Sequence, residues 1–302
     1  MGSAFSLYLE VREMPAQLSF TKMHGLGNSY IYVNGFEQAL SEKRLPELAQ
    51  NVSDPNTGIG ADGLVIMAPS ETAEVKMRIF NKDGSEAKNC GNALRCVAKY
   101  VYEKGMVKNT TFHIETLSGL VRVNVHVVNG TVDEVTVDMG TPKLKSSDLP
   151  MTGGTTEKDL VGVPIEVDGN TVLMTGVSMG NPHGVFFVDD IEEAPVKSYG
   201  PVLSDHHRLF PEGLNVEFVQ VVNSHELQFR VWERGSGITR ACGTGACAAV
   251  VAAVLNNYVK QGKEVTVHLL GGDMKILWAN EGSVYMRGPA VTICEGLYLM
   301  GV

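Results

Sequence analysis

The segment MRIFNKDGSEAKNCGN (77–92) has a counterpart, FRVWERGSGITRACGT (229–244), in the second half of the chain. Each copy begins as a strand-like run, passes through Gly-Ser and ends on Cys-Gly and one more polar residue. Cys242 follows Cys90 by 152 residues. Two copies of one motif at a fixed distance indicate a duplicated fold in which the two cysteines occupy equivalent positions.

Two further pairs of anchors have nearly the same spacing. Gly180 follows Gly27 by 153 residues, and in both places an asparagine and a strand-like run come next. Gly272 follows Gly119 by 153 residues, again at the start of a strand-like run. We therefore predict two homologous halves of about 150 residues each.

Each half is predicted to be mostly strand, with one main helix after the cysteine. After Cys90, apolar residues at 94, 97, 98 and 101 have helical spacing, and Gly105 is a stop signal. The run after Cys242 (GACAAVVAAVL, 245–255) is apolar on every side, so a helix there must be buried all round. Strands wrapped around a central helix meet that requirement.

We therefore predict an α/β (α+β) chain of two pseudo-symmetric domains, each a mixed or antiparallel β-sheet wrapped around a central helix. Segments 121–127 and 132–137 alternate or are rich in β-branched residues, as strands are. The strand-rich end of the chain has no counterpart after the first half, so we expect it to return there. The first domain is placed at residues 1–138 plus 286–302, and the second at 139–285.

Composition narrows the functional class. The chain has 302 residues, 44% of them hydrophobic and 20% charged, which is typical of a soluble globular protein. A net charge of -9 argues against a nucleic-acid partner, and the longest apolar run is half of what a membrane span needs. We read no signal peptide, and five cysteines make a disulfide scaffold a poor interpretation. These features favour the cytoplasm.

The two cysteine motifs suggest paired acid–base chemistry. Each sulfur is expected at a helix N-terminus, where unpaired N–H groups and the helix dipole lower a thiol pKa. The N–H groups of the next two residues can bind a carboxylate; they belong to Gly91 and Asn92, and to Gly243 and Thr244. Two opposed thiols can remove and return a proton on either side of one carbon, which is the chemistry of a racemase.

Other signals are given structural interpretations. We expect Cys96, Cys247 and Cys294 to be packing residues, and no cysteine spacing favours zinc. The GxGxxG match at 58–63 precedes a strand-like run instead of a helix, so it is read as a turn. The adjacent pair at 206 and 207, His-His, is expected on the surface.

The chain closely resembles the diaminopimelate epimerase family, from about residue 20 to the C-terminus. The resemblance rests on four stretches: FTKMHGLGNSY (20–30), FNKDGSEAKNCGN (80–92), VSMGNPH (177–183) and VWERGSGITRACGTGACAA (231–249). Ala93 departs from the family pattern, which usually has glycine there.

The resemblance implies the two-domain fold predicted above, and it implies roles for individual residues. Cys90 and Cys242 would be the catalytic pair in a reaction that uses no pyridoxal phosphate, other cofactor or metal. His183 and Glu233 would help tune the cysteines. The residues implied in substrate binding are Asn28, Asn81, Gly91, Asn92, Asn181, Asn215, Glu233, Arg234, Gly243 and Thr244.

The function we expect is interconversion of LL- and meso-diaminopimelate, in the synthesis of lysine and peptidoglycan precursors. The partner is then a small amino-acid substrate, with no nucleic acid and no membrane, and a homodimer is the assembly to test. Three alternatives stay open: a related racemase acting on histidine or hydroxyproline, a thiol redox protein, and a binding module without catalysis.

Overall fold

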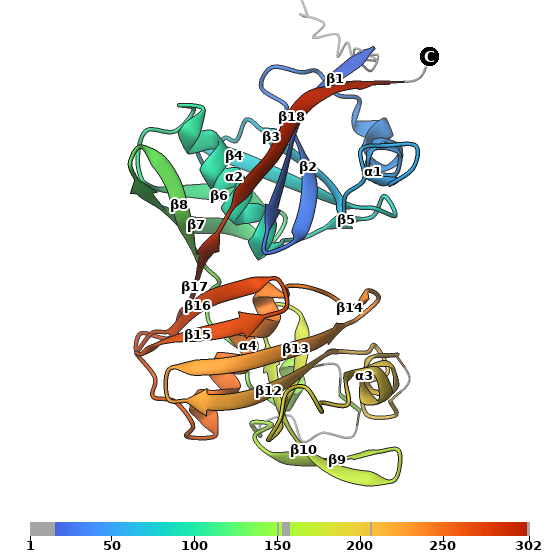
Figure 1. Ribbon diagram of the computed structural model, residues 1–302, viewed down its shortest axis with the longest axis vertical. Helices are drawn as coiled ribbons and strands as arrows, with labels where there is room; N and C mark the ends of the chain where they lie inside the picture. Colours follow the sequence, from blue (N-terminus) through green and yellow to red (C-terminus); the bar gives the residue numbers. More distant parts are fainter. Residues whose placement is uncertain (1–15, 150, 153–157, 206, 301–302) are drawn as a thin grey trace, which may run out of the picture.

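The computed structural model describes residues 16–149, 151–152, 158–205 and 207–300, and it has two lobes stacked end to end (Figure 1). The first 15 residues, for which the sequence analysis makes no functional prediction, lie outside the described part. Among the described helices, none is long and apolar enough to cross a membrane.

The first lobe contains one long buried helix among strands. Its elements are β1 (Gln17–Gly25), β2 (Asn28–Asn34), η1 (Glu42–Arg44), α1 (Leu45–Ser53), β3 (Gly63–Ala68), β4 (Val75–Asn81), β5 (Glu86–Ala87), α2 (Gly91–Glu103), β6 (Thr111–Thr116), β7 (Gly119–Val128) and β8 (Thr131–Asp138).

The second lobe has the same plan. Its elements, after η2 (Ser146–Asp148), are β9 (Val163–Val167), β10 (Asn170–Ser178), β11 (Pro182–Phe187), α3 (Val196–Asp205), β12 (Asn215–Asn223), β13 (Glu226–Glu233), β14 (Gly237–Ile238), α4 (Gly243–Leu255), β15 (Glu264–Leu269), β16 (Gly272–Trp278) and β17 (Val284–Pro289). The last strand, β18 (Val291–Leu299), returns to the first lobe.

Strand pairing confirms the duplication. In the first lobe β1 and β2 are antiparallel, β2 and β3 parallel, β3 and β4 antiparallel, β4 and β6 parallel, and β6 and β7 antiparallel. The second lobe repeats this series with β10, β11, β12, β13, β15 and β16. The registers also correspond: Tyr32 faces Val65 as Val185 faces Glu217.

Two strands near the C-terminus connect the lobes. β17 pairs with β16 on one side and with β8 of the first lobe on the other. β18 then pairs with β1, in the place that β9 takes beside β10 in the second lobe. The domain boundary after residue 285 falls inside β17, and the two domain ranges stay a prediction.

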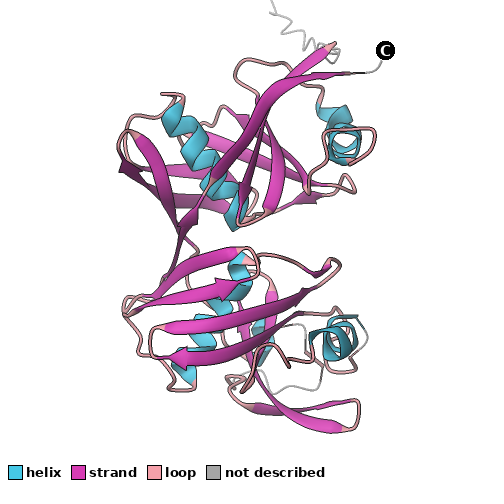
Figure 2. Cartoon of the chain, viewed as in Figure 1, coloured by secondary structure: helices cyan, strands magenta, loops and turns pink. Residues whose placement is uncertain are grey.

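The two predicted central helices are present among the strands of their lobes (Figure 2), and most of their residues are buried. α4 is buried on every side from Gly245 to Ala253, as its uniformly apolar sequence predicts. The apolar positions 94, 97, 98 and 101 of α2 are likewise fully buried. Both helices belong to one apolar core that continues through both lobes. A cysteine stands immediately before the first residue of each of these helices.

Each lobe has a second helix that the sequence analysis did not identify. α1 packs Leu45, Leu48 and Val52 into a separate apolar cluster, so its helical spacing was present in the sequence. α3 contains Pro201, which weakens the local helix signal. It is held by packing, because a Cβ at Gly200 would lie 2.6 Å from the Trp232 ring.

Two sequence predictions about burial are wrong, and one about a turn is confirmed. Cys294, predicted to be a packing residue, is exposed in β18. His207 is buried, not on the surface: its ring packs at 5.7 Å from that of Phe210, and its Nε2 lies 3.0 Å from the carbonyl of Glu166. His206 lies outside the described residues. The glycine-rich segment at 58–63 is a turn before β3, as predicted, with no helix following it.

Candidate active site

The N-termini of the two central helices meet around one side chain of the linking strand. A Cβ at Gly91, the first residue of α2, would lie 2.6 Å from Met286 Cε. A Cβ at Gly243, the first residue of α4, would lie 2.9 Å from Met286 Sδ. Both contacts are with the flexible end of the Met286 side chain. The two Cys-Gly motifs, distant in sequence, therefore converge on the junction between the lobes.

Cys90 is half-buried and occupies the N-cap position of α2, where its side chain makes no capping hydrogen bond. Its sulfur lies 3.8 Å from Oδ1 of Asn28, which also accepts a hydrogen bond from Nδ2 of Asn92 at 3.1 Å. Nδ2 of Asn28 donates to the carboxylate of Asp62 at 2.9 Å. Three of the predicted site residues thus form one cluster, and Asp62 orients it.

Cys242 is buried and caps the start of α4. Its sulfur accepts a hydrogen bond from the N–H of Gly245 at 3.4 Å and lies 3.6 Å from the Thr244 hydroxyl. Nδ2 of Asn181 donates to that hydroxyl at 3.3 Å, and His183 lies behind Asn181. This second cluster contains four predicted residues.

Asn92 and a buried arginine connect the two clusters. Nδ2 of Asn92 lies 3.4 Å from the carbonyl of Ala241, immediately before Cys242. Oδ1 of Asn92 accepts from Nη2 of Arg95 at 2.9 Å, and Nε of Arg95 donates to the carbonyl of Pro289 in β17. Arg95 is fully buried. It therefore ties α2 to the strand that joins the lobes and holds the Asn92 amide in one orientation.

The net direction of the thiol pKa shifts is opposite to the one we expected from the helix N-termini. Burial raises the pKa of Cys90, although N–H groups at the start of α2 and the Tyr30 hydroxyl oppose the shift. Burial raises the pKa of Cys242 further, and the carboxylates of Glu233 and Glu217 add to it. Desolvation outweighs the helix dipole in both places.

The Glu233 carboxylate raises the pKa of both cysteines. Glu233 ends β13, and the Thr239 hydroxyl donates to its Oε1. Burial raises its pKa, while hydrogen bonds from Thr239 and Cys242 oppose the shift. The corresponding residue 152 positions earlier is Asn81, so the two lobes offer different groups at equivalent points.

The remaining predicted residues lie at strand ends outside these clusters. Asn81 bonds to Ser85 in its own turn at 3.0 Å. The Asn215 amide accepts from the N–H of Arg234 at 2.9 Å and donates to the carbonyl of Pro182. The Arg234 guanidinium donates to two loop carbonyls, and no carboxylate among the described residues pairs with it. Arg234 therefore retains donors for a substrate carboxylate.

Sequence reasoning missed five residues of the site: Tyr30, Asp62, Arg95, Glu217 and Thr239. Two of them carried a signal, because Arg95 and Glu217 are charged residues within otherwise apolar segments. Asp62 lies in the glycine-rich turn that was set aside. The contacts of Tyr30 and Thr239 depend on tertiary structure alone.

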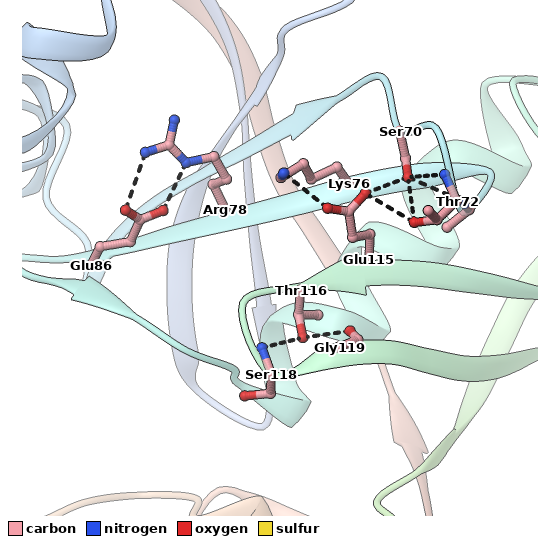
Figure 3. Close-up of polar contacts among 10 residues, drawn as sticks. Ser70, Thr72, Lys76, Arg78, Glu86, Glu115, Thr116, Ser118 and Gly119 are labelled. Carbon is pink, nitrogen blue, oxygen red and sulfur yellow. Dashed lines mark hydrogen bonds and ion pairs between the residues drawn. The ribbon is translucent and has the colours of Figure 1, made fainter.

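The first lobe also has a surface depression, but the charged groups in it already form ion pairs. It is lined by Glu42, Ala68, Lys76, Arg78, Glu86 and Leu117. Its cations are paired, Arg78 with Glu86 at 2.7 Å and Lys76 with Glu115 at 2.9 Å (Figure 3). Among the described residues, no three His, Cys, Asp or Glu side chains are grouped to hold a metal ion.

Comparisons with known proteins identify the family of this chain. The model of the family "Diaminopimelate epimerase" matches residues 20–145 and 175–293. A diaminopimelate epimerase of Geobacillus sp. (strain WCH70) is 64% identical over 282 residues, covering 93% of this chain and 99% of the relative.

Two solved structures share the fold at low identity. A PhzF-family phenazine biosynthesis protein of Bacillus anthracis has a TM-score of 0.68 at 15% identity, covering 94% of this chain and 99% of its own. A hydroxyproline epimerase of Agrobacterium vitis has a TM-score of 0.63 at 14% identity, covering 95% and 92%. The predicted fold class is confirmed. The chain belongs to the diaminopimelate epimerase family and is an isomerase.

Proposed function

We propose that this protein interconverts LL- and meso-diaminopimelate, with Cys90 and Cys242 as the two proton-transfer residues. The observation that carries the proposal is the convergence of both cysteine-capped helix N-termini on Met286. One substrate carbon held at this junction has a sulfur on each side. The 64% identical relative bears the name of this activity.

The chemistry follows from the two sulfurs. The thiolate form of one cysteine removes the α-proton, and its S–H bond forms as the C–H bond breaks. The thiol of the other cysteine gives its proton to the opposite face of the carbon, so the stereocentre inverts and the thiolate changes place. The reverse reaction exchanges the roles of Cys90 and Cys242. Proton count and charge balance without any added reactant.

The helix ends stabilise the charge that develops during proton removal. When the α-proton leaves, electron density moves onto the substrate carboxylate. The N–H groups of Gly91, Asn92, Gly243 and Thr244 lie at the first turns of α2 and α4, where donors are unpaired. We assign them to the α-carboxylate. Donors fixed in advance lower the barrier because they need no rearrangement.

Arg234 and Glu233 supply recognition of the distal end of the substrate. The Arg234 guanidinium is anchored by the carbonyls of Glu212 and Gly213, which leaves other N–H groups for a distal carboxylate. Glu233 is assigned to a substrate amine. A substrate that bears both a carboxylate and an amine at its distal end would bind both residues. Diaminopimelate has such an end and hydroxyproline does not. Asn28, Asn81, Asn181 and Asn215 complete the proposed substrate contacts.

The wider setting is part of the same proposal. We place the protein in the cytoplasm, in the synthesis of lysine and peptidoglycan precursors, working on a small amino acid without a cofactor. A homodimer is the proposed assembly, to be tested by light scattering. A thiol redox role for Cys90 and Cys242 is the second candidate from another class, and activity that requires oxidising conditions would favour it.

The test measures exchange of the substrate α-proton with solvent deuterium by NMR, under reducing conditions. Cys90→Ser and Cys242→Ser should each nearly abolish exchange, while a Cys294→Ala control at an exposed position should keep it. A substrate panel of LL-diaminopimelate, histidine and hydroxyproline then assigns specificity. Full exchange in both serine variants would contradict the two-thiol mechanism, and faster turnover of histidine or hydroxyproline would contradict the substrate assignment.

A further inference from the structure

Behind the Cys242 loop lies a pair of fully buried polar side chains, His183 and Glu217. Nδ1 of His183 lies 2.7 Å from Oε1 of Glu217. Oε2 of Glu217 is buried without a hydrogen-bond partner among the residues that the structure describes. A full carboxylate charge on such an oxygen is costly, so the pair is most stable when it shares one proton.

A line of hydrogen bonds runs from this pair to the sulfur of Cys242. Nε2 of His183 lies 3.0 Å from Oδ1 of Asn181. Nδ2 of Asn181 donates to Oγ1 of Thr244 at 3.3 Å. That hydroxyl oxygen lies 3.6 Å from Sγ of Cys242. Four residues from β11, its preceding turn and the start of α4 thus form one connected path.

The donors give this path a direction. Because Asn181 donates from Nδ2 to Thr244, its Oδ1 faces His183 and requires a proton on Nε2. His183 then keeps that proton whether Glu217 is a protonated donor to Nδ1 or an acceptor from an imidazolium. The Thr244 hydroxyl, already an acceptor from Asn181, is free to donate its hydrogen to the sulfur of Cys242.

The described residues at the equivalent positions of the first lobe form a different arrangement, in which the Tyr30 hydroxyl acts on the Cys90 sulfur directly. Tyr30 stands 153 residues before His183, and Val65 stands 152 residues before Glu217. The imidazole of a histidine has two nitrogens that can bond to two different partners. Tyrosine has only its hydroxyl oxygen, and valine has no polar group. The difference therefore lies in the sequence at two equivalent positions of the same strand pair.

Asn28 of the first lobe, which corresponds to Asn181, has its amide in the opposite orientation. Nδ2 of Asn28 donates to Asp62 at 2.9 Å, so its Oδ1 faces Cys90 at 3.8 Å. Asn181 directs Nδ2 toward the site instead. The asparagine therefore presents an acceptor to Cys90, where the Tyr30 hydroxyl is the side-chain donor, whereas on the Cys242 side the asparagine belongs to a chain of donors.

We propose that Glu217 is a positioning residue for the reaction: through His183 it fixes the Asn181 amide and aligns a line of donors toward the sulfur of Cys242. The proposal rests on the epimerase function proposed above. A hydrogen bond donated to sulfur stabilises the thiolate that Cys242 becomes whenever it loses its proton. It thereby opposes the carboxylate charges of Glu233 and of Glu217 itself, both of which disfavour the thiolate of Cys242.

Two variants of Glu217 separate positioning from packing. The amide of Glu217→Gln can donate to Nδ1 of His183, so the line keeps its direction and kcat should stay within about twofold of the wild type. Glu217→Met fills similar space and cannot donate, so kcat should fall about tenfold, the effect of one hydrogen bond to a charged group. Equal losses in both variants would overturn the proposal.

Two further measurements do not depend on that comparison. The ring ¹⁵N spectrum of His183 should show a protonated Nε2 in the wild type; a ring without that proton would overturn the proposal even if the enzyme were inactive on diaminopimelate. Thr244→Val breaks the last bond, so kcat of Glu217→Met/Thr244→Val should equal that of the more impaired single variant. Losses that multiply would overturn the coupling. An inactive wild type with the expected spectrum would contradict only the proposed function.

Discussion

Gly245→Ala tests how tightly the Cys242 turn is packed. Gly245 is the third residue of α4, and the Cβ of an alanine would lie 2.9 Å from Glu217 Oε1, 3.0 Å from Phe229 Cζ and 3.1 Å from Cys242 Sγ. Non-bonded carbon contacts are optimal at about 3.5–4.0 Å, so all three neighbours must move by several tenths of an ångström. The sulfur is one of them.

The expected effect is larger on rate than on stability. Overpacking costs about 1–3 kcal/mol, and alanine regains about 1 kcal/mol over glycine within a helix. We therefore expect the free energy of unfolding of Gly245→Ala to fall by about 0–2 kcal/mol. The displaced sulfur should reduce kcat for α-proton exchange by about 10- to 100-fold.

The first lobe offers a matched control. Ala93 stands 152 residues before Gly245 and is fully buried. Ala93→Gly adds no atom near Cys90, so exchange should persist, while loss of a buried methyl and of helix propensity should cost about 2 kcal/mol. Urea unfolding and deuterium exchange measure the two effects. If Gly245→Ala exchanged as fast as the wild type, the argument that packing positions Cys242 would be refuted.

Three other predictions follow from burial. Burial raises the pKa of Glu233, so ionising this carboxylate in the folded protein lowers the free energy of unfolding. This loss is absent below the usual pKa of 4.5 and grows as pH rises toward the folded-state pKa. Glu233→Gln should therefore unfold at higher urea than the wild type at about pH 7 but not at about pH 4, although its activity falls. Gly200→Ala should lower the unfolding free energy by about 1–3 kcal/mol, because its Cβ would lie 2.6 Å from Trp232, and an unchanged urea midpoint would contradict this. Cys96 and Cys247 are fully buried, with pKa raised to about 11 and about 12, so iodoacetamide should not label them in the native enzyme; rapid labelling of either would show that α2 or α4 opens.

The residues that sequence reasoning reached are those that repeat or that break a local pattern. Cys90 and Cys242 were found because two copies of a motif identify each other. The burial of α4 followed from an apolar surface with no polar side. α3 was missed because Pro201 obscures its spacing and packing against Trp232 holds it.

The sequence by itself determined the duplication, the helix after each cysteine and the pairing of the two thiols, because these depend on spacing along the chain. Tertiary structure decided the environment of each thiol. Helix ends favour a thiolate at any position, but burial raises both thiol pKa values. Desolvation and the carboxylates of Glu233 and Glu217 depend on which atoms surround the sulfur, and no local pattern contains that information. The asymmetry between Asn28 and Asn181 has the same origin, since each amide is oriented by a partner from another strand or turn.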